Sequence, residues 1–203
     1  MGIPHPCKNP KSIFMGLIGG VGDLVAAAPS VAALKKKYPE AKITFGVGGG
    51  IFFSTIKNDP NIDRFETPFS YDVWKKRTRR KVYREKYREH DLVLLLDNGD
   101  QDWWKQKKHL IDIYSEKCGV TLDRRRPVMY LDERDTEEAM KKLSELEISN
   151  TDKLLILSPE TRSKKKMKEW PYDRFLDLIQ KINENYDFKI ITFVSKDNPY
   201  DYN

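Results

Sequence analysis

Apolar and polar positions near the N-terminus predict a strand, a helix and a second strand in that order. The segment SIFMGLI (residues 12–18) is an apolar run bounded by glycine, which is typical of a buried strand. Helix-spaced apolar residues follow, lysines fill the predicted last turn, and Pro29 is expected to bend or restart the helix. A second apolar run, AKITFGV, spans residues 41–47. Strand, helix and strand in this order indicate a parallel sheet with a right-handed crossover.

The alternation of apolar strands and amphipathic helices continues to residue 147. The run DLVLLLD is apolar enough to be buried on both faces of a sheet. The further expected elements are a short helix from residue 51, strands at 64–68, 91–97 and 128–131, and helices at about 74–89, 106–119 and 135–146. The fold class is therefore α/β, with a tail over residues 1–11 and a first domain over residues 12–147.

A polar stretch, ISNTDK, follows the first domain and reads as a linker. After it a strand at 153–159, a helix with Pro171 in its first turn and a strand at 188–195 repeat the same order. We expect residues 148–203 to be the start of a second, incomplete α/β domain.

Composition narrows the class of protein. Hydrophobic residues make up 39% and charged residues 33% of the chain, and no run approaches the roughly 20 apolar residues that a membrane span needs. The cysteines, Cys7 and Cys118, form no CxxC pair, and the three histidines are scattered singly. We therefore expect a cytoplasmic protein without a zinc site or another metal site.

The net charge of +6 is concentrated in one segment, WKKRTRRKVYREKYREH, at residues 74–90. Such a run is usually a solvated helix face. It also suits an anionic partner, which is nucleic acid, a phosphorylated glycolipid, or a membrane surface that the protein contacts peripherally. With nucleic acid, Trp74, Tyr83 and Tyr87 would stack on bases. No RNA-binding motif accompanies the segment, which makes nucleic acid the least favoured of these partners.

The glycine-rich segment GLIGGVGDL, residues 16–24, leads from the first strand into the first helix. Helix N-termini attract anions, and glycines allow close approach to the backbone. However, Asp23 and Leu24 stand where a Walker A loop has Lys and Ser or Thr, and no acid ends the second strand as a dinucleotide site requires. Asp23 is therefore either a helix N-cap or a hydrogen-bond acceptor and general base for a substrate hydroxyl.

Several stretches, kept in order along most of the chain, resemble the family-nine glycosyltransferases, the ADP-heptose:lipopolysaccharide heptosyltransferases. They are the G-x-x-G-D loop from Gly19 to Asp23, the P-x-x-x-A-L helix from Pro29 to Leu34, and the Tyr38-Pro39 turn. The segments NDPNIDRF, HDLVLLLD and KLLILSPETRSKKKMKEWPYDRFLDLI are also similar to those of the family.

This resemblance implies a GT-B fold of two Rossmann-like domains, in which the first binds the acceptor and the second the nucleotide-sugar. It implies transfer of a heptose-like sugar from an ADP-sugar co-substrate to a glycan or glycolipid, with inversion and without metal or cofactor. Asp23 matches the general base, and Lys168 matches a lysine that contacts the donor phosphates. Gly19, Gly20 and Gly22 match the loop that sugar or phosphate approaches.

Other residues are candidates through their positions. Arg162 and Lys164 lie in the same basic turn as Lys168, and they are either solvated or bind phosphate. Asp97 and Asp100 follow the most apolar strand, where they either cap a turn or meet acceptor hydroxyls.

Two departures from the family pattern bear on activity. Leu17 stands where many members have an arginine, and the family's later D-S/T-G-x-x-H region has no counterpart. The alternative to a glycosyltransferase is therefore an acceptor-binding or interaction module that lacks a donor site.

Overall fold

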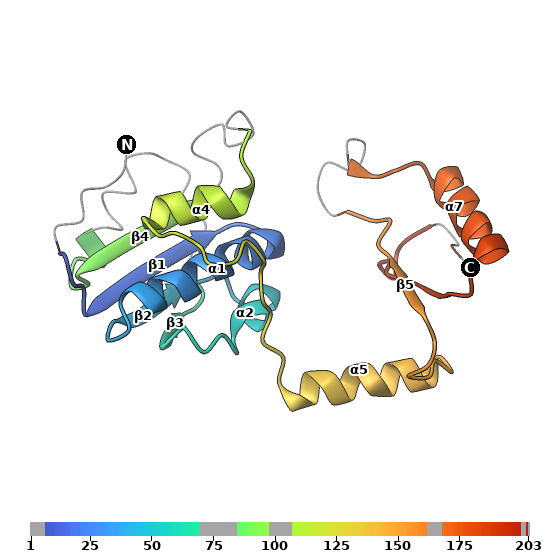
Figure 1. The fold of residues 1–203 in the computed structure, drawn as a ribbon, viewed down its shortest axis with the longest axis horizontal. Coiled ribbons are helices and arrows are strands. Elements are labelled where there is room, and N and C mark those ends of the chain that lie inside the picture. Colours follow the sequence, from blue (N-terminus) through green and yellow to red (C-terminus); the bar gives the residue numbers. More distant parts are fainter. Residues whose placement is uncertain (1–6, 70–84, 98–106, 162–167, 200–201, 203) are drawn as a thin grey trace. The chain divides into compact units, whose positions relative to one another are not determined.

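The computed structural model describes residues 7–69, 85–97, 107–161, 168–199 and 202 (Figure 1). Its contacts divide the chain into two units, Met1–Asp132 and Glu133–Asn203. The sequence placed the domain boundary after residue 147, so the helix just before that position groups with the second unit instead. Each unit is described by itself below.

A parallel four-stranded sheet forms the centre of the first unit, with the strand order β3-β2-β1-β4. The strands are β1 (Ser12–Ile18), β2 (Lys42–Gly46), β3 (Arg64–Glu66) and β4 (Leu92–Asp97). Strand β1 pairs with β2 from Ser12 to Gly16 and with β4 from Ile13 to Ile18. The sequence predicted the parallel sheet and these four strands, three of them (β1, β2 and β4) from apolar runs.

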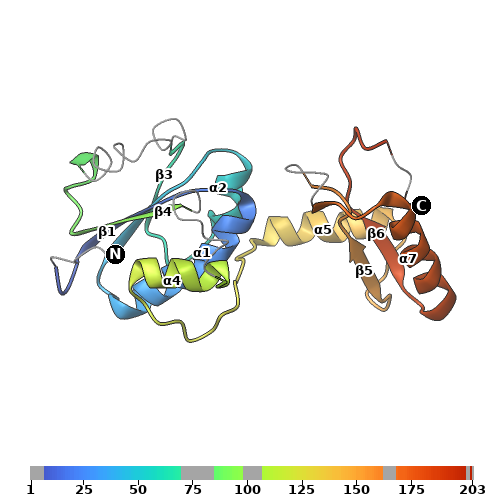
Figure 2. The same cartoon turned by 90° about the horizontal axis from the view of Figure 1, so that it is seen from above.

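The helices α1 (Val21–Lys37) and α4 (Leu110–Cys118) pack together, and α2 (Ile51–Ile56) lies against α1. The two longer helices cover the same face of the sheet (Figure 2). Helix α1 continues through Pro29, so of the two expected effects, a bend or a restart, the restart does not occur. Within the described residues, no helix is long and apolar enough to cross a bilayer.

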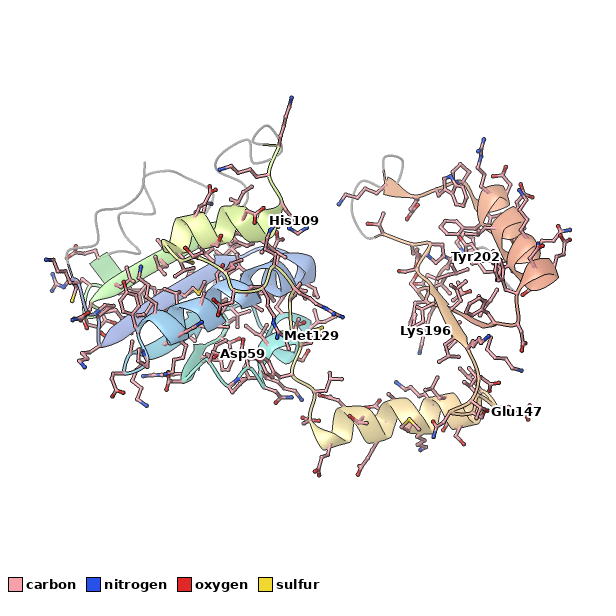
Figure 3. All side chains as sticks on the ribbon, viewed as in Figure 1. Asp59, His109, Met129, Glu147, Lys196 and Tyr202 are labelled. Carbon is pink, nitrogen blue, oxygen red and sulfur yellow. The ribbon has the colours of Figure 1, made fainter. Side chains whose placement is uncertain are left out.

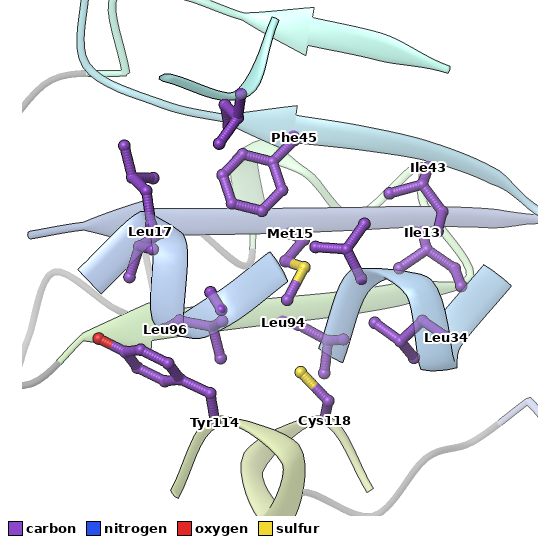
Figure 4. Packing of buried hydrophobic residues seen from close by; sticks show 14 of the residues in the cluster. Ile13, Met15, Leu17, Leu34, Ile43, Phe45, Leu94, Leu96, Tyr114 and Cys118 are labelled. Atoms are coloured by element: carbon purple, nitrogen blue, oxygen red, sulfur yellow. The ribbon is translucent and has the colours of Figure 1, made fainter. Parts of the chain in front are cut away.

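Strand β1 is buried on both faces, as a central parallel strand should be. Ile13, Met15 and Leu17 belong to the larger core, where they join side chains of α1, α4 and the neighbouring strands (Figure 4). Phe14 and Ile18 point to the other face, where they contact a smaller cluster that contains Phe69 and Tyr87. The alternation along β1 therefore anchors both layers.

The second unit contains a parallel pair of strands, β5 (Leu154–Leu157) and β6 (Lys189–Thr192). Helix α7 (Tyr172–Asn185) connects the two strands, and α5 (Glu133–Glu145) precedes them. This is the strand, helix and strand that the sequence predicted. Among the described residues of this unit, Pro159 alone is buried, and Ile156 and Phe193 are each 60% exposed.

The prediction of a strand at residues 128–131 is wrong, because this segment has no secondary structure. Side-chain contacts hold it instead. The Tyr130 hydroxyl accepts a hydrogen bond from Asn61 at 3.5 Å, and Asp132 pairs with Lys57 at 3.1 Å. A β-prone run forms a strand only where a neighbouring edge pairs with it. Of the basic helix expected at about 74–89, residues 70–84 lie outside the described residues.

Asp63 joins the start of β2 to the turn that precedes β3. Its carboxylate accepts hydrogen bonds from the Ile43 amide, Lys35 and Lys42 at 2.9, 2.9 and 3.2 Å. Partial burial opposes the charged form of Asp63, but these three donors outweigh it and lower the pKa to about 2 from 3.8.

Because the folded-state pKa lies below the ordinary value, Asp63 stabilises the fold above about pH 4, and this contribution is lost as the pH falls toward 2. We expect Asp63→Asn to lower the free energy of unfolding at pH 7 by about 1 kcal/mol and to flatten its decline in acid. Urea unfolding at several pH values measures both effects. The control is Asp123→Asn, since the ion pair of Asp123 with Lys36 is exposed on both sides. An unchanged acid profile in Asp63→Asn would contradict the assignment.

Candidate active site at the carboxyl end of β1

The strand order identifies one place in the first unit where a ligand is expected to bind. From β1 the chain crosses through α1 to β2 on one side, while β4 lies on the other side of β1. The connections therefore diverge at the carboxyl ends of β1 and β4, where open α/β sheets form their binding crevice. Ile18 and Asp97 are paired at this point, and Gly19 follows directly.

Asp23 lies in the first turn of α1, immediately beyond this edge. Gly20, and not Asp23, is the N-cap residue, so the N-cap interpretation of Asp23 is wrong in its detail. The Asp23 side chain reaches back along the helix, and its Oδ2 accepts a hydrogen bond from the Gly20 amide at 2.6 Å. This is the carboxylate half of a capping box, which stabilises the start of the helix.

A second donor reaches the same carboxylate from α4. The hydroxyl of Tyr114 donates to Asp23 Oδ1 at 3.2 Å, although the two residues are 91 positions apart in sequence. Tyr114 is fully buried, whereas Asp23 is half-buried. Sequence reasoning missed Tyr114, because its apolar helical spacing shows only that it faces the core.

The three glycines of the loop have different surroundings. A Cβ on Gly19 would lie 2.5 Å from Asp23 Oδ2 and 2.6 Å from Asp23 Cβ, so the missing side chain makes room for the carboxylate. A Cβ on Gly20 would meet only Asp23 Oδ2, at 3.5 Å, and one on Gly22 would meet nothing within 4 Å. Gly20 and Gly22 are exposed, so they leave the backbone open to a ligand.

The structure places part of the predicted site together. Gly19, Gly20, Gly22 and Asp23 lie at one edge of the sheet with the backbone of Asp97, the last residue of β4. Lys168 is exposed and lies in the second unit. The other candidates, Asp100, Arg162 and Lys164, lie outside the described residues.

Tyr87, proposed as a base-stacking residue, is buried, and this part of the nucleic-acid hypothesis is wrong. Its ring stacks on Phe14 with a centroid distance of 3.6 Å, and its hydroxyl donates to Glu66. Burial, together with the hydrogen bond to Glu66, raises the pKa of Tyr87 to about 12. Lys86 completes this group, and its hydrogen bonds with Tyr87 and Glu66 raise its pKa.

No group of three or more His, Cys, Asp or Glu side chains in the described parts of the chain is arranged to hold a metal ion. His109, visible at the start of α4 in Figure 3, has a capping role. Its Nδ1 accepts a hydrogen bond from the Ile111 amide at 3.2 Å. Cys118, at the other end of α4, is buried, and burial raises the pKa of its thiol to about 12.

Several known structures with a similar fold are glycosyltransferases. A family 9 glycosyl transferase from Veillonella parvula matches 93% of this chain, with a TM-score of 0.68 and 20% sequence identity. ADP-heptose lps heptosyltransferase II from E. coli matches 91%, with a TM-score of 0.56 and 14% identity. E. coli heptosyltransferase WaaC, solved with ADP, matches 89%, with a TM-score of 0.52 and 13% identity.

These similarities establish the fold. The chain has the parallel α/β organisation of the family-nine glycosyltransferase structures, which confirms the predicted fold class and the predicted resemblance. It spans 63%, 65% and 67% of the lengths of the three matched chains. No protein-family model and no curated protein matches the sequence.

The contacts of Gly19 and Gly22 differ, so replacing each by alanine tests whether Gly19 makes room for the Asp23 carboxylate. We expect Gly19→Ala to displace the Asp23 carboxylate and to lower the free energy of unfolding by about 1–3 kcal/mol, because the new Cβ overlaps that side chain. Gly22→Ala adds a methyl group in open space within a helix, so it should raise stability by up to about 1 kcal/mol. Urea unfolding of both variants makes the comparison, and equal effects would contradict the assigned role of Gly19.

Proposed function

We propose that this chain acts as a glycosyltransferase that moves a heptose-like sugar from an ADP-sugar to a glycan or glycolipid acceptor. The first unit would bind the acceptor, and the second would contribute to binding of the donor. The observation that carries the proposal is the half-buried carboxylate of Asp23, held by Gly20 and Tyr114 where the connections of the sheet diverge. The glycosyltransferase fold of the structural neighbours supports the same assignment.

The proposed reaction is an inverting transfer without a metal ion, in which Asp23 and Lys168 have the following roles. Asp23 accepts the proton of an acceptor hydroxyl as that oxygen attacks the anomeric carbon of the donor sugar. The bond from this carbon to the diphosphate oxygen breaks on the opposite face, so the configuration inverts and ADP leaves. Lys168 would offset the negative charge that develops on the leaving diphosphate.

The acceptor is proposed to be an anionic glycan or glycolipid. The sequence carries nine of its cations in residues 74–90, and a cationic segment raises the local concentration of an anionic acceptor. The same segment could meet the headgroups of a membrane surface, which would place the enzyme beside a lipid-linked acceptor.

Replacement of Asp23 tests the base. We expect Asp23→Asn to lower the rate of ADP release from ADP-heptose by about 10²–10⁴-fold with a heptose-deficient lipopolysaccharide core as acceptor. Mass spectrometry of the acceptor identifies the added sugar. The matched control is Asp173→Asn, because Asp173 is also an acid in the first turn of a helix, but it lies in the second unit and is exposed.

Two outcomes would overturn this assignment. Full turnover by a folded Asp23→Asn protein would exclude Asp23 as the base. A wild-type protein that binds the acceptor and releases no ADP would favour the acceptor-binding module over the transferase.

The role of Lys168 is tested by nucleotide binding. We expect Lys168→Ala to weaken ADP binding by about 10–100-fold, because a charge-assisted contact to phosphate is lost. Titration calorimetry with ADP measures the change. Lys181→Ala is the matched control, since Lys181 is an exposed lysine within α7 of the same unit. Equal losses in both variants would indicate a general charge effect in place of a specific phosphate contact.

A further inference from the structure

Helix α4 contributes a side chain to the candidate site that the sequence motifs do not indicate. Tyr114 lies within the second turn of α4, which begins after the His109 cap. Its ring lies in the core with Leu96 and Cys118 (Figure 4). Its hydroxyl reaches the Asp23 carboxylate from the side of the core. The tightly packed contact between α1 and α4 therefore ends at the polar edge of the sheet.

Two hydrogen-bond donors from different elements act on different oxygens of the Asp23 carboxylate. The Gly20 amide donates to Oδ2 at 2.6 Å, and the Tyr114 hydroxyl donates to Oδ1 at 3.2 Å. A single donor restrains an aspartate side chain less than two do, because the rotamer about Cα–Cβ and the broad torsion about Cβ–Cγ can both still change. Two donors from different elements, one on each oxygen, define the plane of the group.

Gly19 limits the position of Asp23 from the opposite direction. Its backbone lies so close to the Asp23 side chain that even a methyl group would overlap it. The carboxylate thus lies between Gly19, which follows β1, and the phenol of Tyr114, which is buried in the core. This arrangement leaves Asp23 half-buried, so a ligand at the carboxyl edge can still reach it.

We infer that Tyr114 is a positioning residue that holds the Asp23 carboxylate in one orientation toward the hydroxyl of the sugar acceptor. The effect of Tyr114 on catalysis rests on the proposed function. The orientation of the Asp23 carboxylate does not, because it can be measured in the folded protein without substrate. Tyr114 acts through Asp23 and takes no part in proton transfer. A misplacement of about 1 Å in a reacting group can cost a hundredfold in rate, which is the scale expected here.

The test is Tyr114→Phe, which removes the hydroxyl and keeps the ring that fills the core. We expect Asp23 to change from one side-chain rotamer to a mixture, measured by NMR through the three-bond couplings of its carboxyl carbon. We also expect kcat for sugar transfer from ADP-heptose to fall about 10–100-fold, with the KM for the acceptor unchanged. A residue that only stabilised the fold would change neither quantity in the folded protein.

Tyr87→Phe is the matched control. Tyr87 is also buried, and its hydroxyl also donates to a carboxylate, that of Glu66. This variant should lose stability without changing the Asp23 rotamer or kcat. Gly19→Ala reaches the same carboxylate from the side of β1 and keeps α4 intact, so it should reproduce the rotamer mixture even if Tyr114→Phe folds poorly.

The outcomes separate this inference from the proposed function. An Asp23 rotamer that stays single in a folded Tyr114→Phe protein overturns the positioning role of Tyr114, even if wild-type protein transfers sugar. A rotamer mixture in a protein whose wild type transfers no sugar supports the positioning of Asp23 and counts against the transferase.

Discussion

The carboxylate of Asp23 joins three elements whose packing defines the first unit. It receives hydrogen bonds from the start of α1 and from Tyr114 of α4, and it lies directly against the backbone that leaves β1. These contacts fix where α1 begins relative to the end of the central strand. The right-handed crossover from β1 to β2 then sets the face of the sheet that α1 covers. The same carboxylate thus organises the fold and occupies the place where a parallel sheet binds ligands.

A dual structural and chemical role has a physical cost. A carboxylate near a helix N-terminus stabilises the helix by roughly 0.3–1 kcal/mol, so its replacement disturbs the local structure as well as any chemistry. The glycines of the loop differ in their contacts with Asp23 and in their exposure. Gly19 makes room for the side chain, while Gly20 supplies the amide and, like Gly22, leaves exposed backbone. Gly19 therefore serves the packing of Asp23, Gly22 leaves backbone exposed, and Gly20 does both.

The sequence predicted those parts of the fold that depend on local patterns. The apolar runs of β1, β2 and β4 and the periodicity of α1 and α7 were sufficient to place these elements. The predictions that failed concern residues whose structure depends on contacts with residues far away in the sequence. Residues 128–131 have the composition of a strand, but Tyr130 contacts Asn61 instead of a strand edge. Tyr114 could not be assigned to the site, because only the packing of α4 on α1 brings its hydroxyl to Asp23.

The two units differ in how many buried side chains surround their candidate site residues, Asp23 in the first unit and Lys168 in the second. Asp23 belongs to the unit with the buried core. In that unit, a cluster of buried side chains covers each face of β1. Lys168 precedes a helix without buried residues, beside Trp170, which is 47% exposed and meets Phe175 edge-on. Segments with few buried apolar contacts have low local stability, and a ligand that binds only their ordered form stabilises that form. A nucleotide bound near Lys168 would therefore add order to the second unit, whereas the Asp23 site is preorganised by the core.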